Sequence, residues 1–198
     1  SLIALVERNP ETKDFVLDYP KYKGLEEIDI SKDVMKGEIP HFLQWDERWG
    51  YETYGSDFLA VTGCGPTCLS MVTCGLTGDT QWNPYEVAKM AEDNGYYVDG
   101  SGSSWDLMSS GAEKLGLTVS SVIFDAEHIR ATLEAGQPII CVMGPGDFTD
   151  AGHFLVLTGV DKNGAIILQD PNSVERTKQH WDVQKLMNQM KNLWAYSC

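Results

Sequence analysis

The sequence has no long apolar run and few basic residues. The sequence has 198 residues, and no apolar run in it approaches the roughly 20 residues needed to cross a bilayer. No transmembrane segment is therefore predicted. The chain carries 15 Lys and Arg against 29 Asp and Glu, which gives a formal net charge of −14. Because this charge opposes binding to phosphate backbones and anionic lipids, nucleic acid is not expected as a partner.

Metal-binding patterns are also missing. The four histidines are scattered and no CxxC pair occurs, so neither a metal nor an organic cofactor is expected. The cysteines are Cys64, Cys68, Cys74, Cys141 and Cys198, and their odd number leaves at least one thiol unpaired. Cys68 and Cys74 are six residues apart on a predicted helix and would lie on different faces, which disfavours a disulfide between them.

The N-terminal part differs from the rest. Residues 1–38 are charged and weakly periodic, and we interpret them as an N-terminal extension with a helix over Glu11–Leu17. Residues 39–198 are interpreted as one domain, expected to be monomeric. Since the chain starts with Ser and not Met, we expect a mature form that has lost a signal or anchor. A secreted or cell-surface location follows, with a cytoplasmic one as the alternative.

Helical patterns come first in the domain and strand patterns follow. Four helices are predicted, over residues 65–75, 83–95, 103–115 and 125–136. Strands are predicted at Leu117–Ile123, Pro138–Met143, His153–Val160 and Ala165–Gln169, followed by a helix at Val183–Met190 and a strand at Leu193–Tyr196. The Asn-Gly pair at 163–164 indicates a hairpin between two of these strands. A helical half followed by an antiparallel sheet is an α+β fold.

Cys64 is the candidate nucleophile. It is predicted at or just before the first turn of a helix, where free backbone N–H groups and the helix dipole favour a thiolate. Gly63 and Gly65 carry no side chains, so a substrate carbonyl can approach the sulfur closely. The alternative is a buried structural cysteine in a glycine-rich turn, and these residues alone favour neither interpretation.

His153 and Asp170 support the catalytic interpretation. His153 stands at the entrance of an apolar strand, a position that is rigid yet open to a cleft and suits a general base. Asp170 ends the next strand of the hairpin, so its carboxylate can reach the ring of His153, fix its tautomer and stabilise the imidazolium. A core histidine and an ordinary Asp-Pro turn are the alternatives for each residue taken singly.

Four segments together resemble the papain-like superfamily of cysteine peptidases. They are Gln44-x-Asp46-x-Arg48-Trp49, Gly63-Cys64-Gly65-Pro66-Thr67, Gly152-His153-Phe154 and Asp170-Pro171. The sequence is most similar to the double-glycine bacteriocin-leader peptidases and their stand-alone bacterial relatives, from about Ile39 to the C-terminus. The resemblance implies a papain-like fold, with the nucleophile at a helix N-terminus in a helical half packed on an antiparallel sheet.

By this resemblance, Cys64 is the nucleophile, His153 the base and later the acid, Asp170 the residue that orients His153, and Gln44 a donor to the oxyanion hole. The expected function is a thiol-dependent hydrolase of peptide or amide bonds. Two alternatives are an acyltransferase that passes the same acyl-enzyme to an amine or thiol, and a catalytically silent module of the same fold that binds peptides.

Overall fold

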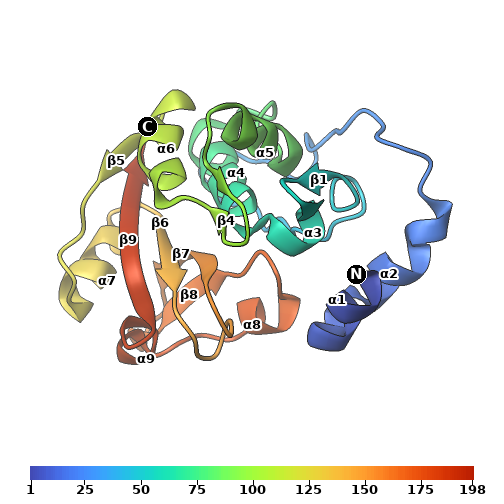
Figure 1. Ribbon diagram of the computed structural model, residues 1–198. Helices are drawn as coiled ribbons and strands as arrows, with labels where there is room; N and C mark the ends of the chain where they lie inside the picture. Colours follow the sequence, from blue (N-terminus) through green and yellow to red (C-terminus); the bar gives the residue numbers. More distant parts are fainter.

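The computed structural model describes residues 1–198, and its core consists of a helical half packed against a sheet half (Figure 1). The α-helices are α1 (Leu2–Arg8), α2 (Lys13–Asp18), α3 (Leu59–Thr62), α4 (Cys64–Thr77), α5 (Pro84–Asp93), α6 (Ser110–Lys114), α7 (Ala126–Glu134), α8 (Val174–Lys178) and α9 (Val183–Met187). Three 3₁₀ helices are η1 (Pro10–Thr12), η2 (Tyr19–Lys21) and η3 (Trp105–Met108). The strands are β1 (Thr53–Tyr54), β2 (Asp57–Phe58), β3 (Tyr97–Val98), β4 (Gly102–Ser103), β5 (Thr118–Ser120), β6 (Ile139–Met143), β7 (His153–Val160), β8 (Ile166–Gln169) and β9 (Met190–Ser197).

The main sheet has five strands in the order β5-β9-β6-β7-β8, and all neighbouring pairs are antiparallel. β6 lies in the middle and is buried along its whole length. Its side chains alternate: Ile140 and Val142 pack toward the helical half, whereas Ile139, Cys141 and Met143 pack in a second core with residues of α7 and α9. The sheet is therefore covered on both faces, and the predicted α+β class is confirmed.

α4 is the central helix of the first half, and its residues from Gly65 to Gly75 are all buried. A Cβ atom at Gly75 would lie 2.5 Å from Ile39 Cδ1, so this glycine permits close packing. The helix was predicted to end near Gly75 but continues to Thr77. Gly78 caps its end, with a φ of 76° in the left-handed conformation common after helices.

Several predicted boundaries are confirmed by capping contacts. Asn83 accepts a hydrogen bond from the Glu86 N–H at 3.0 Å, and Asp125 accepts one from the His128 N–H at 2.8 Å. The hairpin between β7 and β8 turns at Gly164, with a φ of 82°. These features depend on local backbone chemistry, which a sequence pattern captures well.

The helix predicted from Ser103 or Ser104 to Leu115 is wrong in its first part. Ser103 belongs to β4, where it pairs with Tyr97, and its hydroxyl oxygen lies 2.7 Å from Tyr54 Oη. η3 follows, and only Ser110–Lys114 is α-helical. Contacts with residues far away in the sequence hold Ser103 extended, and a local pattern carries no information about them.

The N-terminal segment packs against the domain. Leu5 and Phe15 form a small apolar cluster with Tyr51 and Ala60, and Ile30 enters the main core. The helix predicted over residues 11–17 is found as η1 followed by α2, whereas α1 was not predicted. The extension boundary at residue 38 stays a prediction. No helix in the structure combines the length and apolarity that a membrane crossing requires.

Candidate active site

Cys64 is the first residue of α4, as predicted. It is half-buried with a free thiol, and α4 is 14 residues long. The N-terminal end of such a helix presents unpaired N–H groups and a positive dipole end, both of which stabilise a thiolate. Gly65 is needed beside it, because a Cβ atom there would lie 2.5 Å from Ser103 Oγ. The glycines next to Cys64 therefore serve packing as well as access.

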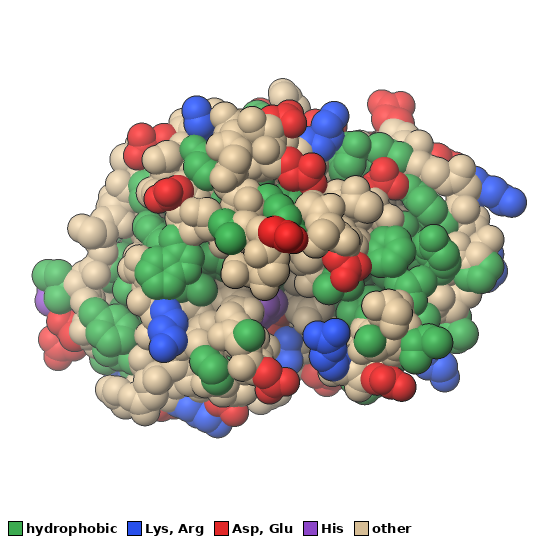
Figure 2. Space-filling view, viewed as in Figure 1, with side chains coloured by type: hydrophobic (Ala, Val, Ile, Leu, Met, Phe, Trp, Pro, Cys, Tyr) green, Lys and Arg blue, Asp and Glu red, His purple; other side chains and the backbone are tan.

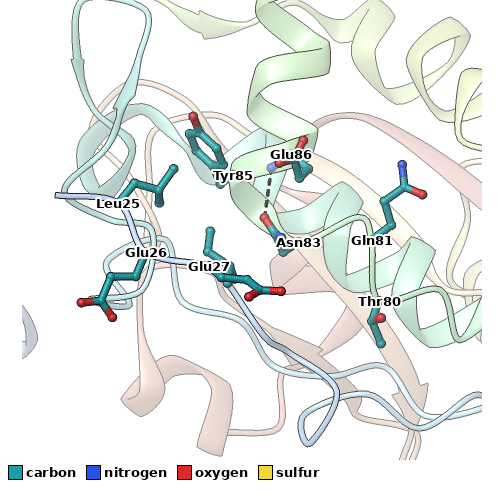
Figure 3. Close-up of a pocket in the computed structure, with 9 residues that line it drawn as sticks. Leu25, Glu26, Glu27, Thr80, Gln81, Asn83, Tyr85 and Glu86 are labelled. Carbon is teal, nitrogen blue, oxygen red and sulfur yellow. Dashed lines mark hydrogen bonds between the residues drawn. The ribbon is translucent and has the colours of Figure 1, made fainter.

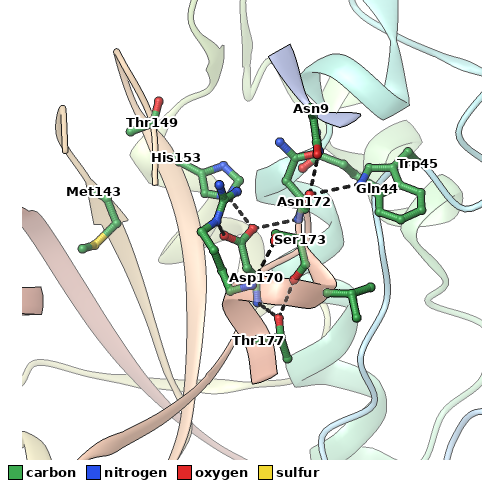
Figure 4. Close-up of polar contacts among 12 residues, drawn as sticks. Asn9, Gln44, Trp45, Met143, Thr149, His153, Asp170, Asn172, Ser173 and Thr177 are labelled. Atoms are coloured by element: carbon green, nitrogen blue, oxygen red, sulfur yellow. Dashed lines mark hydrogen bonds and ion pairs between the residues drawn. The ribbon is translucent and has the colours of Figure 1, made fainter. Parts of the chain in front are cut away.

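His153 and Asp170 come together at one end of the sheet (Figure 4). His153 begins β7 and Asp170 follows β8, and because these strands are antiparallel neighbours the two residues lie at the same end of the hairpin. His153 Nε2 lies 2.7 Å from Asp170 Oδ1. Both side chains are buried. With Nε2 engaged by Asp170, Nδ1 is the ring nitrogen left for Cys64.

The ionisation of Cys64 and His153 is coupled. Burial by itself raises the pKa of the Cys64 thiol, but hydrogen bonding with His153, its positive charge and the N–H groups of Phe154 and Gly65 outweigh burial and lower the pKa below its ordinary value. Burial also lowers the pKa of His153, but the Asp170 carboxylate and the Cys64 sulfur raise it to about 10. The pair is therefore suited to exist as a thiolate beside an imidazolium.

The other core cysteines have the opposite electrostatic environment. Cys68 lies one helical turn after Cys64, and Cys141 lies on β6; both are buried. Burial raises the pKa of Cys68 and of Cys141 well above the ordinary value. Burial also raises the pKa of Cys74 to about 12. Of the cysteines in the core, Cys64 is the one whose surroundings favour the thiolate.

Asp170 makes more hydrogen bonds than the one with His153 that the sequence predicted. Its Oδ1 also accepts the Asn172 N–H at 2.7 Å, and its Oδ2 accepts Arg176 Nε–H at 2.6 Å. Burial would raise the pKa of Asp170, but the positive charges of His153 and Arg176 lower it. Its backbone is fixed too: the N–H donates to Thr177 Oγ1 at 2.9 Å, and the carbonyl oxygen lies 2.7 Å from His41 Nε2.

Gln44 lies on the loop that approaches α3. Its side chain is buried, and its Nε2 donates to the Ala60 carbonyl at 2.8 Å, with the Val61 carbonyl at 3.4 Å. Its Oε1 has no hydrogen-bond partner. Its backbone N–H donates to the Pro171 carbonyl at 2.7 Å, which ties this loop to the Asp170 turn. The contacts of Gln44 thus place it beside the turn that leads into Cys64, and its role in the oxyanion hole stays a prediction.

Arg176 and Ser173 were missed in the sequence. Ser173 caps α8 by accepting the Arg176 N–H at 3.0 Å, which sets Arg176 on the first turn and directs its side chain to Asp170. A signal was present, since Ser followed three residues later by a helix-compatible residue marks an N-terminus. The ion pair itself depends on a turn geometry that the sequence does not specify.

No group of His, Cys, Asp and Glu side chains in the structure has an arrangement that could hold a metal ion. A cavity of about 330 Å³ lies between residues 25–28 and the start of α5 (Figure 3). Glu26, Glu27 and Glu86 are among its lining residues, and none of the four candidate site residues borders it. In the space-filling view, a histidine side chain is visible at the base of a hollow between the helical and the sheet half (Figure 2).

A thiol at a helix N-terminus in one half, paired with a histidine and a carboxylate on an antiparallel sheet in the other, is the arrangement of the papain-like fold. The family described as Peptidase_C39 like matches residues 36–197, and the chain belongs to this family. Membership supports a cysteine peptidase type of function.

Solved structures that are similar to the chain include two peptidases, and the first of them supports this fold. The peptidase domain of Streptococcus ComA, described as a bifunctional ABC transporter involved in a quorum-sensing pathway, matches with a TM-score of 0.51 and 20% identity, over 69% of this chain and 92% of that domain. A putative C39-like peptidase from Bacillus anthracis matches with a TM-score of 0.46 and 18% identity, over 83% of this chain and 97% of that one. No curated protein matches the chain.

Proposed function

We propose that the protein is a cysteine peptidase or amide hydrolase whose catalytic residues are Cys64, His153 and Asp170. One observation carries the proposal: His153 Nε2 is held 2.7 Å from the buried Asp170 carboxylate, and Cys64, whose pKa the positive charge of His153 lowers, begins α4. In this proposal Cys64 is the nucleophile, His153 is the base, and Asp170 orients the base.

The first half of the reaction forms the acyl-enzyme. The Cys64 thiolate attacks the carbonyl carbon of a peptide or amide bond, and the carbonyl π electrons move to the oxygen. Donors at the start of α4 stabilise this oxyanion, together with the Nε2–H of Gln44 that the Ala60 carbonyl does not accept. The tetrahedral intermediate then collapses, the C–N bond breaks, and His153 gives its proton to the departing amine.

The second half releases the acid. His153, now neutral, takes a proton from a water molecule while the oxygen of that water attacks the carbonyl carbon of the thioester. Collapse of the second tetrahedral intermediate breaks the C–S bond and restores the thiolate beside the imidazolium. Asp170 keeps the ring oriented through Nε2 in both halves and stabilises its positive charge, so each step uses only side chains, backbone N–H groups and water.

The test is cleavage of a mixed peptide library, followed by mass spectrometry. The parent protein is expected to release new termini, and Cys64→Ala is expected to release none. Cys198→Ala, which removes a free and exposed thiol, serves as the matched control and should cleave like the parent. Equal cleavage by Cys64→Ala and the parent would refute the proposal. Adding amine acceptors in the same assay separates hydrolysis from acyl transfer.

A further inference from the structure

The N-terminal segment contacts both the helical half and the sheet half of the protein. On the helical side, Phe15 stacks on Tyr51 with ring centroids 4.1 Å apart, and Tyr51 Oη–H donates to the Phe15 carbonyl at 2.6 Å. The same cluster includes Ala60 of α3, four residues before Cys64. The family match begins at residue 36, so most of this segment lies outside the matched residues.

On the sheet side, the segment binds the turn that follows Asp170. Asn9 Nδ2 donates to the Asn172 carbonyl at 2.8 Å and to Asn172 Oδ1 at 3.1 Å (Figure 4). Glu11 accepts hydrogen bonds from the Ser173 hydroxyl, from the Val174 N–H at 2.8 Å and from the Glu175 N–H at 3.4 Å. These contacts join residues more than 160 positions apart in the chain.

Glu11 is thus connected to the triad through a continuous set of hydrogen bonds. The Ser173 hydroxyl donates its one hydrogen to Glu11, which leaves its lone pairs to accept the Arg176 N–H at 3.0 Å. Arg176 Nε–H donates to Asp170 at 2.6 Å, and Asp170 accepts from His153. α8 has only five residues, too few to be stable alone, so contacts at its ends fix its position.

We infer that the N-terminal segment buttresses the Asp170 turn, and that Glu11 is a positioning residue which holds this turn against His153. This inference rests on the proposed function. Without the Glu11 carboxylate, the first turn of α8 loses three acceptor contacts, and Arg176 and Asp170 are free to move with it. Displacement of Asp170 removes the carboxylate that stabilises the His153 imidazolium, and with it the charge that stabilises the Cys64 thiolate.

The experiment measures alkylation of Cys64 by iodoacetamide against pH in the full chain, by peptide mass spectrometry. Exposed Cys198 is the internal reference. The variants are Glu11→Ala and Glu11→Gln. The matched controls are Glu7→Ala and Glu7→Gln, since Glu7 is an exposed carboxylate of the same segment. Thermal unfolding of each variant shows that it is folded at the labelling temperature.

In Glu11→Ala we expect the acid limb of the Cys64 profile to move to higher pH, so that labelling at about pH 6 falls about tenfold. Glu11→Gln should lose less, because its carbonyl oxygen still accepts a hydrogen bond, and both Glu7 variants should match the parent. The conservative variant keeps the test valid if Glu11→Ala does not fold.

Two results would overturn the inference in different ways. A parent-like pH profile in both Glu11 variants, with or without a lower unfolding temperature, would show that Glu11 is only structural and would leave the proposed function intact. If Cys64 of the parent itself labels no faster than Cys198 at about pH 6, the proposed function fails, and the inference fails with it.

Discussion

Replacing Asp170 with asparagine removes the one negative charge buried between His153 and Arg176. The asparagine side chain keeps an oxygen for His153 and for the Asn172 N–H, but its amide places a second donor against Arg176 Nε, where Asp170 accepts at 2.6 Å. His153 then loses the main group that raises its pKa to about 10.

The size of the effect follows from that pKa. A histidine of pKa about 6.5 when unfolded and about 10 when folded contributes about 4 kcal/mol to stability at pH 7. This agrees with the cost of about 3–5 kcal/mol for removing one partner of a buried ion pair. We therefore expect Asp170→Asn to lower the free energy of unfolding by about 3–4 kcal/mol at neutral pH.

The sign of the pH dependence is fixed by both groups. Since the folded pKa of His153 is raised, its contribution is complete below about pH 6.5 and is lost as the pH rises through about 10. Since the folded pKa of Asp170 is lowered, its contribution is present above about pH 4 and is lost as the pH falls further. The difference in unfolding free energy between parent and variant should therefore be largest between about pH 4 and about pH 6.5, and it should shrink toward pH 10.

Urea unfolding followed by tryptophan fluorescence at several pH values measures this difference. Asp125→Asn is the matched control, because Asp125 pairs with His128 at 2.6 Å on the exposed surface and Asn is an equally good N-cap. The control should change stability by less than about 0.5 kcal/mol. An Asp170→Asn variant within about 1 kcal/mol of the parent, or a difference independent of pH, would refute the reasoning.

Arg176→Gln leaves a buried carboxylate oxygen of Asp170 unpaired, so it should lower the free energy of unfolding in urea by about 2–3 kcal/mol. The control Lys178→Gln breaks an exposed ion pair and should cost less than about 0.5 kcal/mol. Equal losses in the two variants would contradict this reasoning. Gln44→Ala should slow amide hydrolysis about 10²–10³-fold while alkylation of Cys64 stays unchanged, and parallel losses in both rates would exclude an oxyanion role. Hydrolysis should rise as Cys64 ionises below the ordinary thiol pKa and decline as His153 loses its proton near pH 10, and a pH–rate profile with no decline would contradict the role of His153 as acid.

Local chemistry explains what the sequence could predict of the fold. The caps at Asn83 and Asp125 and the hairpin turn at Gly164 depend on neighbouring residues, and each was predicted. The insertion of β9 between β5 and β6 was not predicted, because strand order depends on packing between distant segments. The same reason explains the broken helix at Ser103, which Tyr54 holds in an extended strand.

The candidate site divides in the same way. Cys64, His153 and Asp170 each stand at the boundary of an element, and the structure brings His153 and Asp170 together, with the charge of His153 lowering the pKa of Cys64. Arg176 and Glu11 act through tertiary contacts: one reaches Asp170 from a short helix, and the other reaches that helix from the opposite end of the chain. No spacing in the sequence marks either contact.

The central claim is that Cys64 is a thiolate paired with protonated His153. Ultraviolet difference titration of the parent against Cys64→Ala measures this directly, because the thiolate absorbs and the thiol does not. The account predicts that the Cys64 thiolate is already present well below the ordinary thiol pKa of about 8.5, and that His153→Ala abolishes this early ionisation. A thiolate that appears only at or above that pH in the parent would contradict the claim.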